Sequence, residues 1–370
     1  MDAILHESTI HRRRERLSKM TDGSELGDIY SATIERIKAQ NGDKSRLGMA
    51  ALMWISHAER PLMADELCHA LAVELGSTDF SAVNIPSMST LVSSCQGLIT
   101  VDKEASTVRL IHVTLQEYFS AHSDIFSQPH SAMAEICLTY LNSQQVKALS
   151  IAPSAGTQNT PFLDYCSVYW GMHAKRELSD SARSLALELL KEHYSQISTK
   201  LLLAHVKYFN LWDFDTFSPF SGLHCASLFG IVEVVATLIE VGCCDINVED
   251  FSGCTPLSWA ARNGHEEAVK ILLGRGEVNP DKPDNYGQTP LLHAARSGHE
   301  GVVKILLGQQ EVNPDKPDNY GKRPLTYAAS CGYEGVVKIL LGREGVGADK
   351  PDRVGRTRSH MLLGLEEREW

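Results

Sequence analysis

The sequence lacks the short motifs that mark common enzyme sites. It contains no Gly-x-Ser-x-Gly, no His-Glu-x-x-His, no Cys-x-x-Cys and no Gly-x-x-x-x-Gly-Lys-[Ser/Thr]. These patterns build a nucleophile elbow, a zinc protease site, a paired-thiol site and a phosphate-binding loop, respectively. The acidic residues are scattered rather than paired. We therefore expect no catalytic site, no resident metal and no cofactor.

Positive charge, long apolar runs and spaced cysteines are also scarce. A net charge of −11 disfavours nucleic acid as a general partner. No apolar run approaches the ~18 residues of a membrane span, and Met1–His6 lacks the basic flank and apolar core of a signal peptide. The nine cysteines, with Cys243 and Cys244 adjacent, show no metal or disulfide spacing. We expect reduced thiols and a cytoplasmic protein that uses neither membrane nor nucleic acid.

A repeated unit organises the C-terminal half of the chain. The second copy begins Gly253-Cys-Thr-Pro-Leu257, and the third begins Gly287-Gln-Thr-Pro-Leu291, 34 residues later. The fourth keeps Gly321 and the following Pro-Leu, and a degraded first copy starts at Leu223. The array predicts a domain over residues 216–350, because a fixed period of this length indicates stacked repeats.

Each position of the unit has a physical reason. Thr-Pro opens a helix with a capping hydroxyl and a proline at the first helical position. An Ala-Ala pair allows close helix packing, and Gly264, Gly298 and Gly332 suit the turn into a second helix. Two short helices cannot bury their apolar stripes alone, so the units must stack. The pattern resembles the ankyrin repeat, which implies an α-solenoid that binds protein partners.

The ankyrin resemblance also implies which residues touch a partner. They are the loop tips before Thr-Pro and the two residues after Ala-Ala. At the tips these are Phe251, Ser252, Cys254, Asn285, Tyr286, Gln288, Asn319, Tyr320 and Lys322; on the helices they are Arg262, Asn263, Arg296, Ser297, Ser330 and Cys331. Tyrosine and arginine are enriched at interface hot spots. The alternative is that the near-identical tips merely stack on one another.

Residues 46–122 predict a compact second module. Helices are expected over 47–58, 65–75 and 87–97, followed by a hairpin of residues 98–102 and 107–112. Three helices and a hairpin form a winged-helix order. The wing tip Asp102-Lys103-Glu104 is not basic, and the third helix carries no Lys or Arg. Since DNA-reading winged helices need such residues, DNA binding is disfavoured.

The same region resembles a known module. The stretches Trp54–Leu62, Glu66–Val73, Gly97–Val101, Val108–His112 and Gln116–Phe119 look like the winged helix that follows the NACHT domain in fungal NACHT–ankyrin proteins. Such proteins are NOD-like signalling ATPases with an upstream phosphate-binding loop. The resemblance therefore implies the C-terminal part of such a receptor without its NACHT ATPase. The alternative is a fragment of a signal-transducing NACHT ATPase whose nucleotide-binding domain is missing from this chain.

His112 has two interpretations. In the relatives a histidine of the winged helix contacts the bound nucleotide, so His112 would sense nucleotide if a NACHT domain completed the chain. The other interpretation is a structural cap on the helix that begins near Thr114.

The remaining segments predict helices. Residues 1–45 should form two, the first with the run His11–Arg16 on a solvated face and the second with Ile29, Thr33, Ile34 and Ile37 on its buried face. Residues 123–215 predict a helical linker with a flexible loop at 144–161, an aromatic core segment at 162–174, and Trp212–Asp215 packed on the first repeat. The fold class is thus mainly α: a winged-helix-like module, a helical linker and an ankyrin-repeat solenoid.

The C-terminal residues 351–370 depart from the repeat. Asp352–Thr357 begins a fifth copy in register, but the following Arg358–Trp370 has no repeat pattern. One inserted base in a permitted coding sequence restores Thr-Pro-Leu and Ala-Ala in the correct frame. We therefore expect an aberrant or truncated fifth repeat that leaves the fourth repeat, around Leu340 and Leu341, without a cap. The codons of the locus test this inference.

Overall fold

The computed structural model describes residues 24–102, 104–149, 160–191, 197–206, 220–242 and 245–346. The chain forms two compact units, Met1–Ala148 with Ser154–Tyr169, and Leu149–Pro153 with Trp170–Trp370. Several expected features lie outside the described residues. They are the first N-terminal helix with His11–Arg16, Lys103, most of the 144–161 loop, Trp212–Asp215, Cys243-Cys244 and the fifth repeat.

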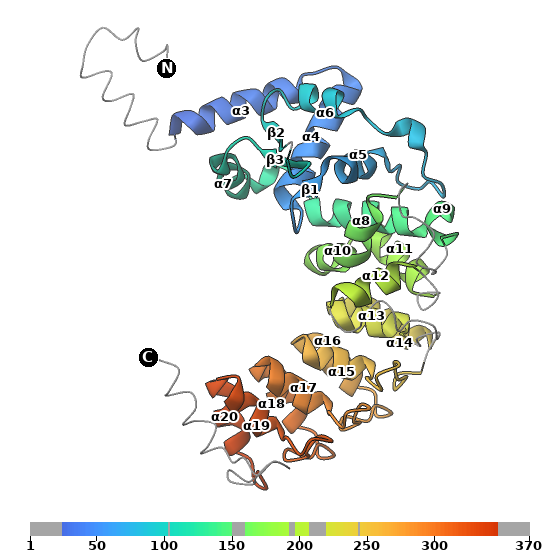
Figure 1. Ribbon diagram of the computed structural model, residues 1–370, viewed down its shortest axis with the longest axis vertical. Helices are drawn as coiled ribbons and strands as arrows, with labels where there is room; N and C mark the ends of the chain where they lie inside the picture. The colour runs from blue at the N-terminus through green and yellow to red at the C-terminus, as the bar shows by residue number, and fades with distance from the viewer. Residues whose placement is uncertain are drawn as a thin grey trace, which may run out of the picture. The chain divides into compact units, whose positions relative to one another are not determined.

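The first unit contains the expected helices and hairpin. In chain order these are α4 (Gly42–His57), β1 (Leu62–Met63), α5 (Ala64–Ala72), α6 (Met88–Ser94), β2 (Ile99–Asp102) and β3 (Thr107–Leu110) (Figure 1). The antiparallel sheet has the order β1-β3-β2. The prediction of three helices followed by a hairpin is confirmed. Strand β1 was not predicted, because two residues beside Pro61 are too few to show alternation.

Helix α3 (Ser24–Lys38) packs on α7 (Val113–Ala121) in the same unit. The Tyr30 and Thr114 hydroxyls lie 2.8 Å apart across this contact. Ile34 and Ile37 are buried as predicted, but Ile29 is exposed and Tyr30 is buried instead. The prediction for Ile29 was wrong because the buried stripe runs through Tyr30, Ile34 and Ile37, at helical spacings of four and three residues.

An aromatic cluster forms the core beside the winged-helix elements. Trp54 of α4 makes edge-to-face contacts with Phe162 and Tyr165, at centroid distances of 5.4 and 5.8 Å. Tyr140 also packs edge-on against Phe162. These residues come from α8 (Pro129–Asn142) and the segment that opens α10 (Leu163–Arg176), while the short η1 (Ala82–Asn84), η2 (Ser123–Ile125) and α9 (Gln144–Lys147) complete the unit. The aromatic stretch after residue 161 is therefore core, as predicted.

The second unit is a stack of helix pairs. The stack begins with α11 (Asp180–Lys191) and α12 (Ile197–His205). The first two pairs are α13 (Gly222–Phe229) with α14 (Val232–Val241) and α15 (Pro256–Arg262) with α16 (Glu266–Leu273). The next two are α17 (Pro290–Ser297) with α18 (Glu300–Leu307) and α19 (Pro324–Ser330) with α20 (Glu334–Leu341) (Figure 1). The first helix of each pair packs on the first helix of the next, and the second helices do the same. The predicted two helices per repeat are confirmed.

The predicted caps explain where these helices begin. The Thr255 and Thr289 side chains accept hydrogen bonds from the backbone N–H groups of Ser258 and Leu292. Proline follows each threonine at the first helical position, where no N–H is needed. In the fourth repeat Arg323 replaces the threonine and makes no side-chain cap.

The turn between the two helices of a repeat joins it to its neighbour. Gly264 has a φ of +74°, and a Cβ there would lie 2.6 Å from the His299 ring of the next repeat. His299 Nε2 lies 3.0 Å from the Arg262 carbonyl oxygen and donates a hydrogen bond to it. His265 bonds the Leu228 carbonyl in the same way at 2.9 Å. The Gly-His pairs thus tie one repeat to the preceding one.

The two ends of the stack differ. Helix α11 packs on α13 and α14, and Gly222 lies so close to the Leu190 carbonyl that a Cβ would approach it to 2.4 Å. Linker helices therefore cover the first repeat. In the fourth repeat Leu340 is buried, contrary to our expectation, whereas Leu341 is 37% exposed against 8% for Leu307 of the third repeat.

Candidate protein-interaction surface

An aspartate organises the loop tip of repeats two to four. In the third repeat, Asp284 Oδ1 accepts the backbone N–H groups of Tyr286 at 2.9 Å and Gln288 at 2.7 Å. Asp250 and Asp318 accept the equivalent pairs of N–H groups in their own repeats. The buried carboxylates hold each tip in one conformation, because hydrogen bonds to a charged acceptor are stronger than neutral ones.

The second oxygen of each aspartate meets a ring nine residues further on. Trp259 Nε1 donates to Asp250 Oδ2 at 2.8 Å, and Tyr327 donates its hydroxyl to Asp318 Oδ2 at 2.9 Å. His293 Nε2 lies 3.1 Å from Asp284 Oδ2. Burial and the bond to Asp318 raise the pKa of Tyr327 to about 12. We did not predict this set of contacts from the sequence, although the constant offset of nine residues between aspartate and ring indicates it.

The tips are also bonded to one another. Asn285 donates its side-chain amide to the Phe251 carbonyl at 3.0 Å, and Asn319 donates to the Asn285 carbonyl at 3.0 Å. Their backbone N–H groups bond the preceding tips as well. Gly253 is required beneath Asn285, because its φ is +78° and a Cβ would lie 2.8 Å from the Asn285 nitrogen. The two asparagines are therefore primarily structural.

The structure divides the predicted contact residues by exposure. Tyr286 and Tyr320 are 51% and 57% exposed. Also exposed are Asn263, Asn285, Arg296, Asn319, Ser330 and Cys331, whereas Phe251, Arg262, Ser297 and Lys322 are half-buried. Ser252, Cys254 and Gln288 are buried, since the turn around the aspartate folds them inward. We remove these three from the candidate surface. Tyr333, which is 37% exposed, was missed.

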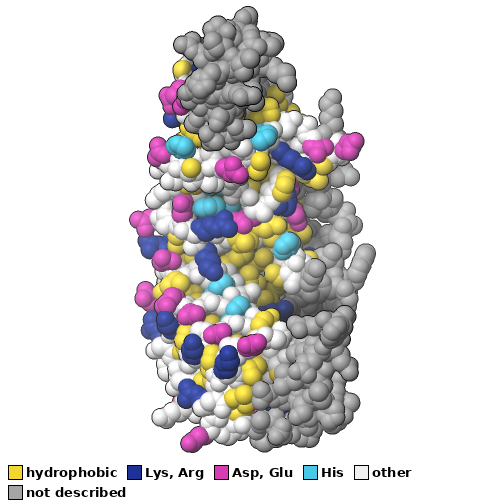
Figure 2. All heavy atoms as spheres, turned by 90° about the vertical axis from the view of Figure 1, so that its left-hand side faces the viewer, with side chains coloured by type: hydrophobic (Ala, Val, Ile, Leu, Met, Phe, Trp, Pro, Cys, Tyr) yellow, Lys and Arg dark blue, Asp and Glu magenta, His cyan; other side chains and the backbone are white. Residues whose placement is uncertain are grey.

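Cationic side chains of this surface lie over neighbouring aromatic rings. The Arg262 guanidinium is 5.6 Å from the Trp259 ring centroid, and that of Arg296 is 5.5 Å from the ring of Tyr327 in the next repeat. Lys322 Nζ lies 5.1 Å from the same Tyr327 ring. Such contacts orient long side chains before a partner arrives. Elsewhere, Figure 2 shows Lys, Arg, Asp and Glu side chains interspersed on the face that it displays.

Comparison with known families agrees with this geometry. Residues 191–284 and 275–353 match the family model for ankyrin repeats. The chain contains ankyrin repeats. Residues 34–128 match the winged-helix domain of the GPI inositol-deacylase family model. A search of curated proteins found no match. Ankyrin repeats are typically non-catalytic binding modules, and the solenoid class predicted from the 34-residue period is confirmed.

The winged-helix domain places His112 at a helix start. Its Nδ1 accepts the Thr114 backbone N–H at 3.2 Å and lies 2.9 Å from the Thr114 hydroxyl. The capping interpretation of His112 is therefore confirmed in this chain.

Helix α6, which would occupy a DNA groove, is Met-Ser-Thr-Leu-Val-Ser-Ser and carries no cation. At the wing, Asp102 accepts the N–H groups of Glu104 and Ala105.

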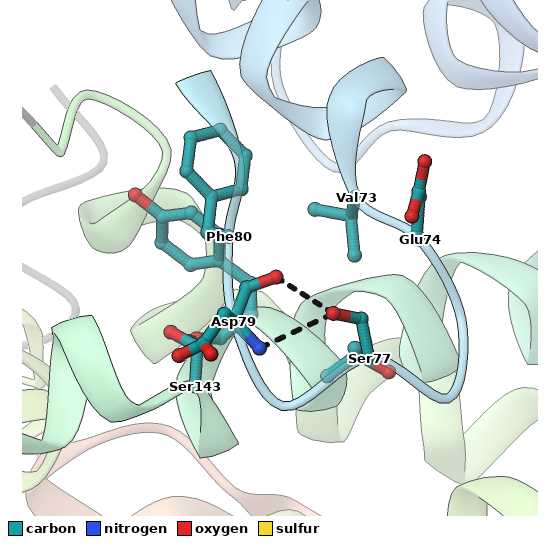
Figure 3. Close-up of a pocket in the computed structure, with 8 residues that line it drawn as sticks. Val73, Glu74, Ser77, Asp79, Phe80 and Ser143 are labelled. Atoms are coloured by element: carbon teal, nitrogen blue, oxygen red, sulfur yellow. Dashed lines mark hydrogen bonds between the residues drawn. The ribbon is translucent and has the colours of Figure 1, made fainter. Parts of the chain in front are cut away.

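A pocket in the first unit is too small to be a cofactor site. It lies between the segment after α5 and helix α8 and includes Val73, Ser77, Phe80 and Thr139 in its lining (Figure 3). Its empty volume of about 190 Å³ includes open solvent, whereas ligand pockets usually enclose roughly 300–1,000 Å³. At the pocket, the Ser77 hydroxyl donates a hydrogen bond to the Asp79 carbonyl oxygen and accepts one from the Asp79 backbone N–H.

Within the described residues, no helix has the length and apolar character needed to cross a bilayer.

Proposed function

We propose that this chain is a non-catalytic interaction protein whose ankyrin stack binds a protein partner. The supporting observation is the pair of exposed tyrosines, Tyr286 and Tyr320, on tips held by buried aspartates and by tip-to-tip hydrogen bonds. A rigid aromatic side chain loses little conformational freedom on binding, so it contributes affinity at low entropic cost. Arg262, Arg296 and Lys322 supply the charged margin of the same surface.

A comparative capture experiment tests this surface. The full chain, the Tyr286→Ala/Tyr320→Ala variant and a matched Lys304→Ala/Lys338→Ala variant serve as baits for cross-linking and quantitative mass spectrometry. The two lysines are exposed on the second helices, away from the tips. We expect a partner whose recovery falls at least tenfold with the tyrosine variant and is unchanged with the lysine variant. Equal recovery with all three baits would contradict the proposed surface.

The winged-helix domain suggests the biological setting of this binding. We propose that it is the regulatory module of a cytoplasmic NACHT-type signalling receptor. Residues 34–128 match the GPI inositol-deacylase winged-helix domain, and the same region resembles the winged helix that follows the NACHT domain in such receptors. The same match supports a second possibility, that the chain is the C-terminal part of a signal-transducing ATPase. An in-frame phosphate-binding loop upstream in the gene would favour the second possibility over the first.

Whichever of these two settings applies, we expect this chain to show no activity toward nucleotides. The purified chain should neither bind nor hydrolyse ATP, because its sequence has no Gly-x-x-x-x-Gly-Lys-[Ser/Thr] loop to surround the phosphates. Isothermal titration calorimetry with ATP and ADP measures the binding directly. A micromolar dissociation constant for either nucleotide would refute the prediction.

A further inference from the structure

Three metal-ligating side chains meet between the second and third ankyrin repeats. Cys254 Sγ lies 3.7 Å from Asp284 Oδ2 and 3.8 Å from His293 Nε2. His293 Nε2 and Asp284 Oδ2 are 3.1 Å apart. All three residues are buried. Cysteine comes from one repeat and the other two ligands from the next, so no spacing in the sequence indicated a metal site.

The triangle of donor atoms has the size of one face of a metal tetrahedron. With the usual Zn–S, Zn–N and Zn–O bond lengths, tetrahedral geometry places such donors about 3.3–3.6 Å apart. The observed nitrogen–oxygen separation of 3.1 Å lies slightly below that range, and the two separations from sulfur, 3.7 and 3.8 Å, lie slightly above it. Asp284 keeps its other oxygen on the tip N–H groups. This bond fixes the orientation of the carboxylate, as outer hydrogen bonds do at metal sites.

The interfaces between the first and second repeats and between the third and fourth repeats carry other side chains at the positions of Cys254 and His293. At the position of Cys254 the flanking repeats have Phe220 and Gln288, and at the position of His293 they have Trp259 and Tyr327. Phe220 packs edge-on against Trp259 with 5.5 Å between centroids. Only the pair Cys254 and His293 offers two metal ligands. The indole of Trp259 is a donor only, and Tyr327 keeps its proton in a hydrogen bond to Asp318, whereas neutral imidazole, a common metal ligand, offers a nitrogen lone pair.

We propose that Cys254, Asp284 and His293 bind a transition-metal ion of the Zn²⁺ class. A thiolate, a carboxylate and a neutral imidazole balance the charge of a divalent ion, which favours binding in a buried position. The fourth coordination position is left for water. Because the ligands come together only when the two repeats stack, bound metal would stabilise their interface. The site lies beneath the tips, and Asp284 belongs to both features, because its other oxygen holds the tip that carries Tyr286.

Metal titration of the full chain tests the proposal. Zn²⁺ is added to reduced protein in competition with a chromophoric chelator, and Co²⁺ reports on the thiolate through its charge-transfer absorption. The key variant is Cys254→Gln/His293→Tyr, which converts this interface into a copy of the next one, Gln288 and Tyr327. It should therefore fold, which circular dichroism verifies. Cys331→Ala removes an exposed cysteine elsewhere and serves as the control.

We expect one Zn²⁺ per chain, a Co²⁺–thiolate band and a Zn²⁺-dependent rise in Tm for the wild type and for Cys331→Ala. In the interface variant, affinity should fall at least about 100-fold, since removal of even an outer-shell partner costs 10–100-fold, and the band and the Tm rise should disappear. If the wild type binds no Zn²⁺, or if the folded interface variant binds it equally well, the cluster is only a thiol–imidazole–carboxylate contact and the proposal is overturned.

Discussion

Leu291→Ala should lower the free energy of unfolding by about 2–5 kcal/mol, the usual cost of truncating a buried leucine. Leu291 is completely buried in α17, the first helix of the third repeat, and this helix packs on α15, α18 and α19. A cavity there weakens the contacts with both neighbouring repeats. Since the stability of a repeat array depends on such interfaces, the loss should not remain local to one repeat.

Urea denaturation followed by circular dichroism measures this effect. Tyr286→Ala is the matched control, because it removes a larger side chain from the same repeat at an exposed position. We expect it to change the free energy of unfolding by about 0.5 kcal/mol or less. Equal losses in the two variants would show that the buried and exposed faces of the third repeat have been confused. The same denaturation measurement on Tyr286→Ala/Tyr320→Ala checks that the variant used for partner capture remains folded.

Acidification below pH 6.5 should destabilise the second compact unit, which contains the repeats, through His224 and His265. Burial lowers the pKa of His224 to about 4 in the folded chain, and burial together with nearby Lys175 lowers that of His265 to about 4. In the unfolded chain both titrate near 6.5. Between these values only the unfolded state takes up the protons, so stability is complete above pH 6.5 and declines as the pH falls toward 4. The fully buried His224 should contribute about 1.4 kcal/mol per pH unit.

Unfolding measured by urea at pH values from 7 to 4.5 gives the slope. His224→Leu and His265→Tyr together introduce the residues that the third and fourth repeats carry at these positions, Leu292 and Tyr333. This double variant should have a shallower pH dependence than the wild type over the same interval. Parallel curves would mean that the two histidines do not cause the acid response.

The repeat architecture was predictable because its physical causes are local. Thr255 and Thr289 cap helices, and Gly264 adopts a positive φ between two helices, so single residues report on the structure around them. The period then determines which helices stack. The order of the winged-helix elements was predictable for the same reason, since each helix and the hairpin has its own apolar pattern.

The details of the candidate site depend instead on contacts across repeats. Trp259, His293 and Tyr327 are three different aromatic residues, so their common role as partners of an aspartate oxygen becomes visible only when each ring is compared with the aspartate nine residues before it. Likewise, Ser252 and Gln288 are polar residues in a loop, a pattern typical of exposure. They are buried because the aspartate of each tip accepts hydrogen bonds from the backbone N–H groups of the tip, and the resulting turn directs these side chains inward.

Each of the last two tips donates hydrogen bonds to the tip before it, and this repeated pattern bears on how the array can vary in length. An in-frame loss of residues 285–318 would place Asn319 directly after Asp284, where it would meet the Phe251 carbonyl as Asn285 does now. A duplication of the same segment would extend the series by the same bond. Recombination between these near-identical units can therefore alter their copy number in the gene without any compensating substitution in the tips.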